Sequence, residues 1–349
     1  AEEEGGGGEM NDTFLKACRG EETPYTPVWI MRQAGRYLPE YQKVRAKVDF
    51  LTLCKTPELA AEVTLQPVEI LKVDAAILFS DILIPLEPMG MKLEFSESKG
   101  PVLHDPLRTD SAVAGLRSIV PEEDVPFVIE AVKLLVKRLP VPLIGFSGAP
   151  FTLATYMIEG GSSRNFIHTK GMMYRRPALF SQLMDKITET VIRYLQAQVD
   201  AGAQAIQVFD SWAGALSPAD FTTLALPWVR KIITAFKGKL PVIYFAFNGS
   251  AMLKQVRTAG ADVFGLDWRI DMADAVQALG KDVAVQGNMD PCLLFGTRDL
   301  IRERASQILS GAGEAKGHIF NLGHGILPET PPDNAMSLVD CVHELSQRR

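Results

Sequence analysis

The sequence predicts an α/β fold, a single (β/α)8 TIM barrel whose active-site cleft lies at the carboxyl ends of the strands. Eight short apolar runs alternate with helical stretches, which is the pattern of βα units in a parallel sheet. Eight is also the number of strands that closes such a barrel. No linker or change of composition divides the 349 residues, so we expect one domain over residues 11–349 behind a disordered tail over residues 1–10.

The predicted strands are the runs richest in valine, isoleucine, phenylalanine and leucine. In chain order they are VWIM (28–31), AAILF (75–79), PLIGF (142–146), AIQVF (205–209), VIYFA (242–246), DVFGL (262–266), VAVQG (283–287) and HIFNL (318–322). The early strands are far apart in the chain, which leaves room for extra helices or long loops between them.

Capping signals mark several of the helices between these strands. The segment 250–260 begins with a serine as predicted N-cap and ends on a glycine, and the segment 271–280 begins with an aspartate and also ends on a glycine. Ser217 followed by Pro218 likewise indicates a helix start with proline at its first position.

Polar side chains follow nearly every predicted strand, where the carboxyl ends of all strands of a barrel meet at one mouth. They are Arg32, Gln33, Ser80, Asp81, Ser147, Asp210, Ser211, Asn248, Asp267, Asn288, Asn321 and His324. Polar residues also simply terminate strands, and that interpretation is favoured for Asn248, Asp267 and Asn288. Asp81 differs because it lies inside the hydrophobic run DAAILFSDILIPL, where an unpaired charge would be costly. It therefore has a partner or faces a polar cavity.

Composition excludes several classes of function. With 47% hydrophobic residues, 22% charged residues and a formal net charge of −6, the chain is predicted to be globular and to lack the basic surface that nucleic acid requires. No apolar stretch approaches the ~18 residues of a membrane span.

The four cysteines have no CxxC spacing, which predicts free thiols in a reducing compartment. The N-terminal AEEEGGGGEM lacks the apolar region of a signal peptide.

Motifs for metals, nucleotides and a nucleophilic serine are also missing. The five histidines show no HxH, HExxH or cysteine-paired spacing, so a built zinc site is not expected. The glycine-rich segments 159–165 and 311–317 lack the lysine of a phosphate loop or the strand-to-helix setting of a dinucleotide site. There is no GxSxG elbow, and no lysine that could form a Schiff base ends a predicted strand.

The segment MRQAGRYLPEYQKVR (31–45) is the strongest candidate for a binding site. It places Arg32, Arg36 and Arg45 close together straight after an apolar run. A solvated basic face is one interpretation, and an anion clamp is the other. Guanidinium groups bind carboxylates bidentately, so several of them in a concave site would recognise a polycarboxylate. Asp81 could then accept hydrogen bonds from substrate N–H groups and stabilise developing positive charge.

Seven motifs, in this order, resemble those of uroporphyrinogen decarboxylases. They are PVWIMRQAGRYLPEY, LQPVEILKVDAAILFSDIL, PLIGFSGAPFTLATYMIEGGSS, GAQAIQVFDSW, GLDW, VQGNMDP and FNLGHGI, and the likeness runs from about Asn11 to the C-terminal helix. The resemblance implies a homodimeric barrel, a carboxy-lyase of haem or chlorophyll biosynthesis that removes CO2 from the four acetate side chains of uroporphyrinogen III to give coproporphyrinogen III. It also implies that no metal or organic cofactor is needed.

The resemblance further implies roles for individual residues. Carboxylate-binding positions would be Arg32, Gln33, Ala34, Gly35, Arg36 and Arg45, with Tyr156, Ser211 and His324 completing the pocket. Asp81 would be the catalytic residue at the centre, where it receives the pyrrole N–H groups. Decarboxylation needs an electron sink, which a pyrrole protonated beside the acetate arm supplies, so Asp81 is expected to stabilise that cation. The proton donor stays open among Arg32, water, a substrate carboxyl group, Tyr156 and His324.

Two other functions are kept as alternatives. Related barrels transfer methyl groups from a corrinoid or to a thiol with zinc, typically through a His-x-Cys pair near the mouth, whereas this chain has His324-Gly325-Ile326. A non-catalytic tetrapyrrole binder would keep the clamp without turnover. The compartment is expected to be the cytoplasm, or a plastid if the N-terminus is the remnant of a processed transit peptide.

Overall fold

The computed structural model of the chain describes residues 9–96 and 98–348. Within them, one curled sheet holds seven parallel strands in the order β1-β4-β5-β6-β7-β8-β9. Their bounds are β1 Ala76–Ile77, β4 Leu143–Gly148, β5 Ala205–Asp210, β6 Val242–Ala246, β7 Val263–Gly265, β8 Ala284–Met289 and β9 Gly317–Leu322. A separate antiparallel hairpin consists of β2 Lys92–Ser96 and β3 Gly100–His104.

Helices connect the parallel strands, as the crossovers of an α/β sheet require. The longer ones are α4 Pro57–Leu71, α7 Pro126–Val136, α8 Pro150–Glu159, α9 Ile167–Arg175, α10 Pro177–Ala201, α12 Leu226–Phe236, α14 Met272–Leu279, α15 Arg298–Gly311 and α16 Pro332–Ser346. The shorter ones are α1 Thr13–Arg19, α2 Pro39–Arg45, α3 Phe50–Lys55, α5 Asp110–Ala114, α6 Pro121–Asp124, α11 Pro218–Leu224 and α13 Leu253–Arg257. The 3₁₀ turns are η1 Ile84–Leu86, η2 Ala213–Ala215, η3 Ser250–Met252 and η4 Pro291–Phe295.

The segment 28–31, predicted as the first strand, is irregular instead. Val28 alone makes a β-bridge in this segment, parallel to Phe320 of β9. The N–H groups of Ile30 and Met31 donate to side-chain oxygens, at 2.9 Å each, instead of to a neighbouring strand. The prediction of a regular strand was wrong here, because side-chain acceptors take these two N–H groups.

The same segment nevertheless lies where an eighth strand would be. On one side, the Phe320 N–H of β9 donates to the Pro27 carbonyl at 2.8 Å. On the other side, the Val28 carbonyl accepts from the Asp74 N–H, two residues before β1, at 2.7 Å. The α/β class and the parallel sheet are therefore confirmed, while eight-stranded closure of the barrel stays a prediction.

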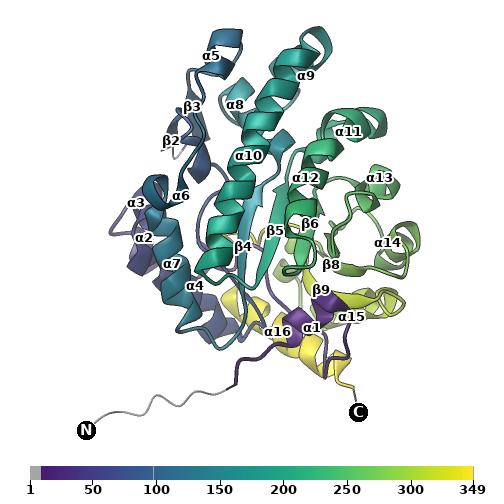
Figure 1. Cartoon of the computed structure of the whole chain (residues 1–349). Helices are drawn as coiled ribbons and strands as arrows, with labels where there is room; N and C mark the ends of the chain where they lie inside the picture. Colours follow the sequence, from purple (N-terminus) through teal and green to yellow (C-terminus); the bar gives the residue numbers. More distant parts are fainter. Residues whose placement is uncertain (1–8, 97, 349) are drawn as a thin grey trace.

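The strands all point toward one end of the molecule, and the loops that follow them gather there. β4 ends at Gly148 and α8 begins two residues later, while β5 ends at Asp210 shortly before η2. In Figure 1, α8, α9 and α11 lie at the upper end, whereas α1 and α16 lie at the lower end. α1 packs against β8 and β9. Polar residues that are remote in the sequence thus share one mouth.

The centre of the sheet is apolar but also holds paired polar side chains. β4, β6 and β8 are buried along their whole lengths, as expected for strands covered on both faces. Trp29 Nε1 donates to Gln286 Oε1 at 2.9 Å, and Gln286 Nε2 donates to Gln207 Oε1 at 3.0 Å. Because buried polar groups are costly unless paired, these bonds fix the irregular segment 27–31 against β8 and β5.

The predicted helix caps were right in two cases and wrong in one. Ser217 precedes α11, and its Oγ accepts from the Asp220 N–H at 3.1 Å. Asp271 is the N-cap of α14, which ends before Gly280, although its side chain makes no capping bond. Ser250 is not a side-chain cap, because the chain first makes a 3₁₀ turn there before α13 begins.

Most of the predicted tail over residues 1–10 lies outside the described residues. Met10, at its end, packs against the core, and its sulfur accepts a hydrogen bond from Gln204 Nε2 at 3.1 Å. We propose that residues 11–349 form one domain. In the part of the chain that the structure describes, no helix combines the length and the hydrophobicity that crossing a membrane needs.

Candidate active site

The loop after residue 30 is held in shape by buried hydrogen bonds of Gln33. Its Oε1 accepts from the Ile30 N–H at 2.9 Å, and its Nε2 donates to the Ala75 carbonyl at 3.0 Å. The Tyr37 hydroxyl donates to the Gln33 carbonyl at 2.7 Å. Gln33 is almost fully buried, so its amide ties the loop to the residue before β1. Direct contact between Gln33 and a ligand, which the sequence predicts, stays a prediction.

Ala34 and Gly35 form the half-buried tip of this loop. The Leu38 N–H donates to the Gly35 carbonyl at 3.0 Å. A Cβ at Gly35 would lie 2.8 Å from the Arg32 carbonyl, closer than van der Waals contact allows. The tip therefore needs glycine for its tight turn, and the turn places the backbone of residues 34 and 35 beside Arg32.

Arg32 lies against the loop that follows β9. Its backbone is left-handed, with φ +61°. A Cβ at Gly325 would lie 2.3 Å from Arg32 Cδ and 2.8 Å from Arg32 Cγ. The Ile326 N–H donates to the Met31 carbonyl at 2.9 Å and joins the two loops. The stem of Arg32 thus occupies the space that a side chain at residue 325 would fill.

Asp81 follows β1 at the turn into η1. Its Oδ1 accepts a hydrogen bond from the Leu83 N–H at 2.8 Å. Burial raises the pKa of Asp81 above its ordinary value, while that hydrogen bond and the positive charge of Arg32 lower it. Within residues 9–96 and 98–348, no protein donor bonds to Asp81 Oδ2. One carboxylate oxygen is anchored and the other can accept a ligand N–H.

Arg36 and Arg45 differ in how the fold holds them. Arg36 is exposed, whereas Arg45, the last residue of α2, is half-buried and its Nη1 donates to the Val48 carbonyl at 2.5 Å. Burial raises the pKa of Tyr41, and the positive charges of both arginines lower it. Both therefore lie within electrostatic range of the same ring. Arg36 exposes its guanidinium group to solvent, while one N–H of the Arg45 guanidinium group is bonded to the neighbouring loop.

Tyr156 and Ser211 come from α8 and from the loop after β5. The Tyr156 ring centroid lies 6.1 Å from that of Trp212. Burial raises the pKa of Tyr156, the negative charge of Asp81 raises it too, and the positive charge of Arg32 lowers it. Tyr156 is thus a weaker acid than usual and lies within electrostatic range of both groups. Ser211 is half-buried beside Trp212.

His324 lies after β9 and is neutral near pH 7. Its ring centroid lies 4.5 Å from that of Phe247 and 6.5 Å from that of Phe245. Burial lowers the pKa of His324 from 6.5 to about 4, and the positive charges of Arg32 and Arg269 contribute. It can therefore exchange hydrogen bonds with a ligand but carries no charge there.

Arg269 is a cation at the mouth that the sequence analysis did not single out. Its guanidinium carbon lies 4.9 Å from the ring centroid of Phe247 and 4.5 Å from that of Trp268. Its Nη1 lies 3.6 Å from Asp267 Oδ1. Stacking and the ion pair fix this guanidinium. The signal available in the sequence was its place directly after the motif GLDW.

Hydrogen bonds among Asn248, Asp267 and Asn288 confirm that these polar residues organise strand ends. Asp267 Oδ2 accepts from the Asn248 N–H at 2.6 Å. Asn288 Nδ2 donates to the carbonyls of Asp267 and Ile270 at 2.9 and 2.8 Å. The loops after β6 and β7 are therefore bonded to each other and to the end of β8.

Asp210 is a buried acid whose function the sequence analysis also left unassigned. Its Oδ1 accepts from Thr152 Oγ1 and its Oδ2 from the Tyr244 hydroxyl, both at 2.7 Å. Burial raises the pKa of Asp210 to about 6, although both hydrogen bonds lower it. Thr152 Oγ1 in turn accepts from the Trp212 N–H at 3.1 Å. Asp210 thus anchors the loop that presents Ser211.

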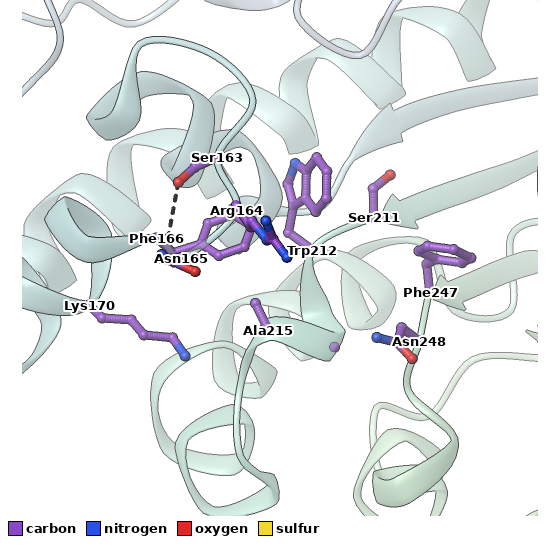
Figure 2. A pocket seen from close by; sticks show the side chains of 11 residues that line it. Ser163, Arg164, Asn165, Phe166, Lys170, Ser211, Trp212, Ala215, Phe247 and Asn248 are labelled. Carbon is purple, nitrogen blue, oxygen red and sulfur yellow. Dashed lines mark hydrogen bonds between the residues drawn. The ribbon is translucent and has the colours of Figure 1, made fainter. Parts of the chain in front are cut away.

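A cavity of about 580 Å³ adjoins these residues (Figure 2). It is lined by Ser163, Arg164, Asn165, Phe166, Lys170, Ser211, Trp212, Gly214, Ala215, Phe247 and Asn248. Trp212 connects it to Tyr156, and Phe247 connects it to His324, through the ring contacts described above. The structure therefore gathers Arg32, Asp81, Tyr156, Ser211 and His324 around one mouth, next to a cavity most of whose lining the sequence did not predict.

The described part of the chain contains no group of three His, Cys, Asp or Glu side chains close enough together to hold a metal ion.

Comparisons with known proteins agree with the sequence motifs. Residues 9–345 match the family model "Uroporphyrinogen decarboxylase (URO-D)". A uroporphyrinogen decarboxylase from Carboxydothermus hydrogenoformans is 57% identical over 97% of both chains, and one from Desulfotalea psychrophila is 58% identical over 97% of this chain and 99% of the other. Among solved structures, a methyltransferase from Methanosarcina mazei superimposes with a TM-score of 0.81, covering 97% of this chain and 99% of that one at 22% identity. At that identity the match concerns the fold alone.

Proposed function

We propose, because the chain belongs to the uroporphyrinogen decarboxylase family, that it removes CO2 from the four acetate side chains of uroporphyrinogen III and releases coproporphyrinogen III. The observation that carries the proposal is the setting of Asp81. One carboxylate oxygen is fixed by the Leu83 N–H, the other has no protein donor among the described residues, and Arg32 lies within electrostatic range of the carboxylate. Such a group suits a ligand that offers N–H groups and carboxylates together.

The reaction needs a place for the electron pair of the C–C bond that breaks. A proton first adds to the pyrrole carbon beside the acetate arm, which makes the ring cationic. The bond between the acetate methylene and its carboxylate then breaks, CO2 leaves, and the electron pair neutralises the ring. A proton adds to the methylene to form a methyl group, and the ring proton leaves. Each round consumes one proton and releases one CO2.

Asp81 supports this sequence by stabilising the cationic ring. Its free oxygen accepts pyrrole N–H groups in the ground state, and its negative charge interacts more strongly once the ring is positive. Only such a difference between ground and transition state accelerates a reaction. Losing one comparable electrostatic contact costs about 3–4 kcal/mol. The N–H donors and the cation of the bound substrate would also lower the pKa of Asp81, which burial raises.

The remaining predicted residues hold and orient the substrate in this proposal. Arg32, Arg36 and Arg45 bind carboxylates, and Tyr156, Ser211 and His324 offer neutral hydrogen-bonding groups. Because His324 is unprotonated near pH 7 and Tyr156 is a weaker acid than usual, neither is a ready source of protons. These pKa directions leave Arg32, water and a substrate carboxyl group as candidate donors.

We further propose that the protein is a homodimer and works in a reducing, cytoplasmic environment. The family resemblance supports the dimer, and sedimentation equilibrium of the purified chain tests it. All four cysteines are free thiols, three of them buried, which suits a reducing compartment. A monomeric mass at all concentrations would contradict the dimer.

The direct test is incubation of the purified chain with uroporphyrinogen III. Four equivalents of CO2 per tetrapyrrole and a tetracarboxylic product are expected, without added metal or cofactor. Tight binding without CO2 release would instead establish a tetrapyrrole binder. Zinc analysis of the same preparation separates the remaining alternative, since one bound zinc per chain would favour a methyltransferase.

A further inference from the structure

The cavity beside Ser211 has a strongly positive wall. Its lining includes two cationic side chains, Arg164 and Lys170, and no acidic one. Figure 2 shows Lys170 extending into the cavity on the side away from Phe247 and Asn248, while Arg164 belongs to the same lining. The chain as a whole carries a formal charge of −6, so this positive wall is a local feature and not part of a general basic surface.

Neither cation is neutralised by a neighbour. In the part of the chain that the structure describes, no ion pair and no side-chain hydrogen bond involves Arg164 or Lys170. The nearby acid Glu159 is engaged elsewhere, because its Oε1 accepts from the N–H and the Oγ1 of Thr169 at 2.8 and 2.9 Å. Two cations without counter-ions that line one cavity make it a favourable place for an anion.

The loop that carries Arg164 is fixed in place. Phe166 has a left-handed backbone, with φ +54°, which is uncommon for a residue other than glycine. Its N–H donates to Ser163 Oγ at 3.0 Å, and its buried ring lies 5.4 Å from Trp212. Lys170 follows in the first turn of α9. Phe166, although strained, is therefore held by two contacts, and it positions the positive wall beside the loop that presents Ser211.

The cavity is also adjacent to the groups proposed to act on the substrate. Trp212 contacts both Phe166 and Tyr156, and Phe247 contacts His324. A ligand seated at Asp81 and reaching Ser211 would extend its side chains into this space. The three arginines of the segment 31–45 and Arg269 are fewer than the eight carboxyl groups of uroporphyrinogen, which leaves carboxylates that further cations could bind.

We propose that Arg164 and Lys170 form a second carboxylate-binding subsite, which takes side-chain carboxylates of the tetrapyrrole on the Ser211 side of the pocket. The inference rests on the proposed function for the identity of the ligand. The role of this subsite is binding, because Arg164 and Lys170 hold carboxylates that do not react while Asp81 stabilises the ring that does. Losing them should raise KM and leave kcat near that of the unmodified chain.

The test uses the full chain with Arg164→Gln, Lys170→Gln and both together. Steady-state CO2 release gives KM and kcat, and titration with oxidised uroporphyrin gives Kd. We expect each single variant to raise both KM and Kd about 10-fold, and the pair more, since a hydrogen bond to a charged group contributes about 1.5–3 kcal/mol. The kcat should stay within about threefold. Arg164→Lys should recover much of the affinity.

Arg175→Gln is the matched control. Arg175 is an exposed cation at the end of the helix that carries Lys170, outside the cavity lining, so its loss changes net charge as much as either single variant does. Unchanged KM and Kd in the double variant would overturn the proposal, and so would a rise in the control equal to that of the single variants. If the unmodified chain released no CO2, the proposed function would fail on its own. Loss of uroporphyrin binding in the double variant, but not in the control, would then still support the subsite.

Discussion

Gly325→Ala tests whether the loop after β9 positions Arg32. The added methyl would lie 2.3 Å from Arg32 Cδ, 2.8 Å from Cγ and 2.9 Å from Nε. Ordinary van der Waals contact begins near 3.4 Å, so the stem of Arg32 must move by at least about 1 Å, a misplacement that can reduce a rate by ~100-fold when it reaches a binding group. The two loops cannot simply separate, because the Ile326 N–H bonds to the Met31 carbonyl at 2.9 Å.

We expect Gly325→Ala to lower kcat/KM for uroporphyrinogen by about 10- to 100-fold, mainly through KM. Overpacking should also cost about 1–3 kcal/mol of the free energy of unfolding, so urea denaturation is measured alongside activity. Gly171→Ala is the control, since a Cβ there meets no atom within 4 Å and alanine favours the helix. Wild-type KM and kcat in Gly325→Ala would refute the proposed contact between these loops.

The remaining predictions concern the loop after residue 30, the half-buried His318 and the arginine clamp. Gln33→Ala leaves the Ile30 N–H and the Ala75 carbonyl unpaired, so urea denaturation should show a loss of about 2–4 kcal/mol; an unchanged midpoint would contradict this. Burial lowers the pKa of His318 from 6.5 to about 4. As the pH falls, this residue is therefore protonated in the unfolded chain before it is protonated in the folded chain, and the free energy of unfolding decreases from pH 6.5 toward pH 4. His318→Gln should reduce the fall in the free energy of unfolding between pH 7 and pH 5 by on the order of 1 kcal/mol. Equal falls in the variant and in the unmodified chain would contradict this prediction. Arg36→Ala should raise KM about 10-fold at similar kcat, and an unchanged KM would count against the clamp.

The parallel sheet could be predicted from the sequence because buried strands form continuous apolar runs between capped helices. The first run, 28–31, looks the same but is not a strand. The N–H groups of Ile30 and Met31 donate to the side chains of Gln33 and Asn321, and these pairings depend on tertiary placement, which hydrophobic periodicity does not report. Ser250 failed as a cap for a related reason, since the local turn became 3₁₀.

The candidate site could be predicted in part. Arg32 and Asp81 stand out as charges next to apolar runs, and the structure places them within electrostatic range of each other. The positions of Arg164, Lys170 and Arg269 could not be inferred in the same way, because each lies on a loop or helix where cations are ordinary. What singles them out is a cavity wall or an aromatic stack, and both arise only when distant segments meet.

The role of Asp81 is tested most directly by CO2 release from uroporphyrinogen III in Asp81→Asn, with exposed Asp340→Asn as the control for lost charge. Asparagine keeps the shape and an oxygen for the Leu83 N–H but removes the negative charge. We predict a fall of about 100- to 1000-fold in kcat, with the unfolding midpoint close to that of the unmodified chain. Turnover at the unmodified rate in Asp81→Asn would contradict stabilisation of a cationic ring by this carboxylate.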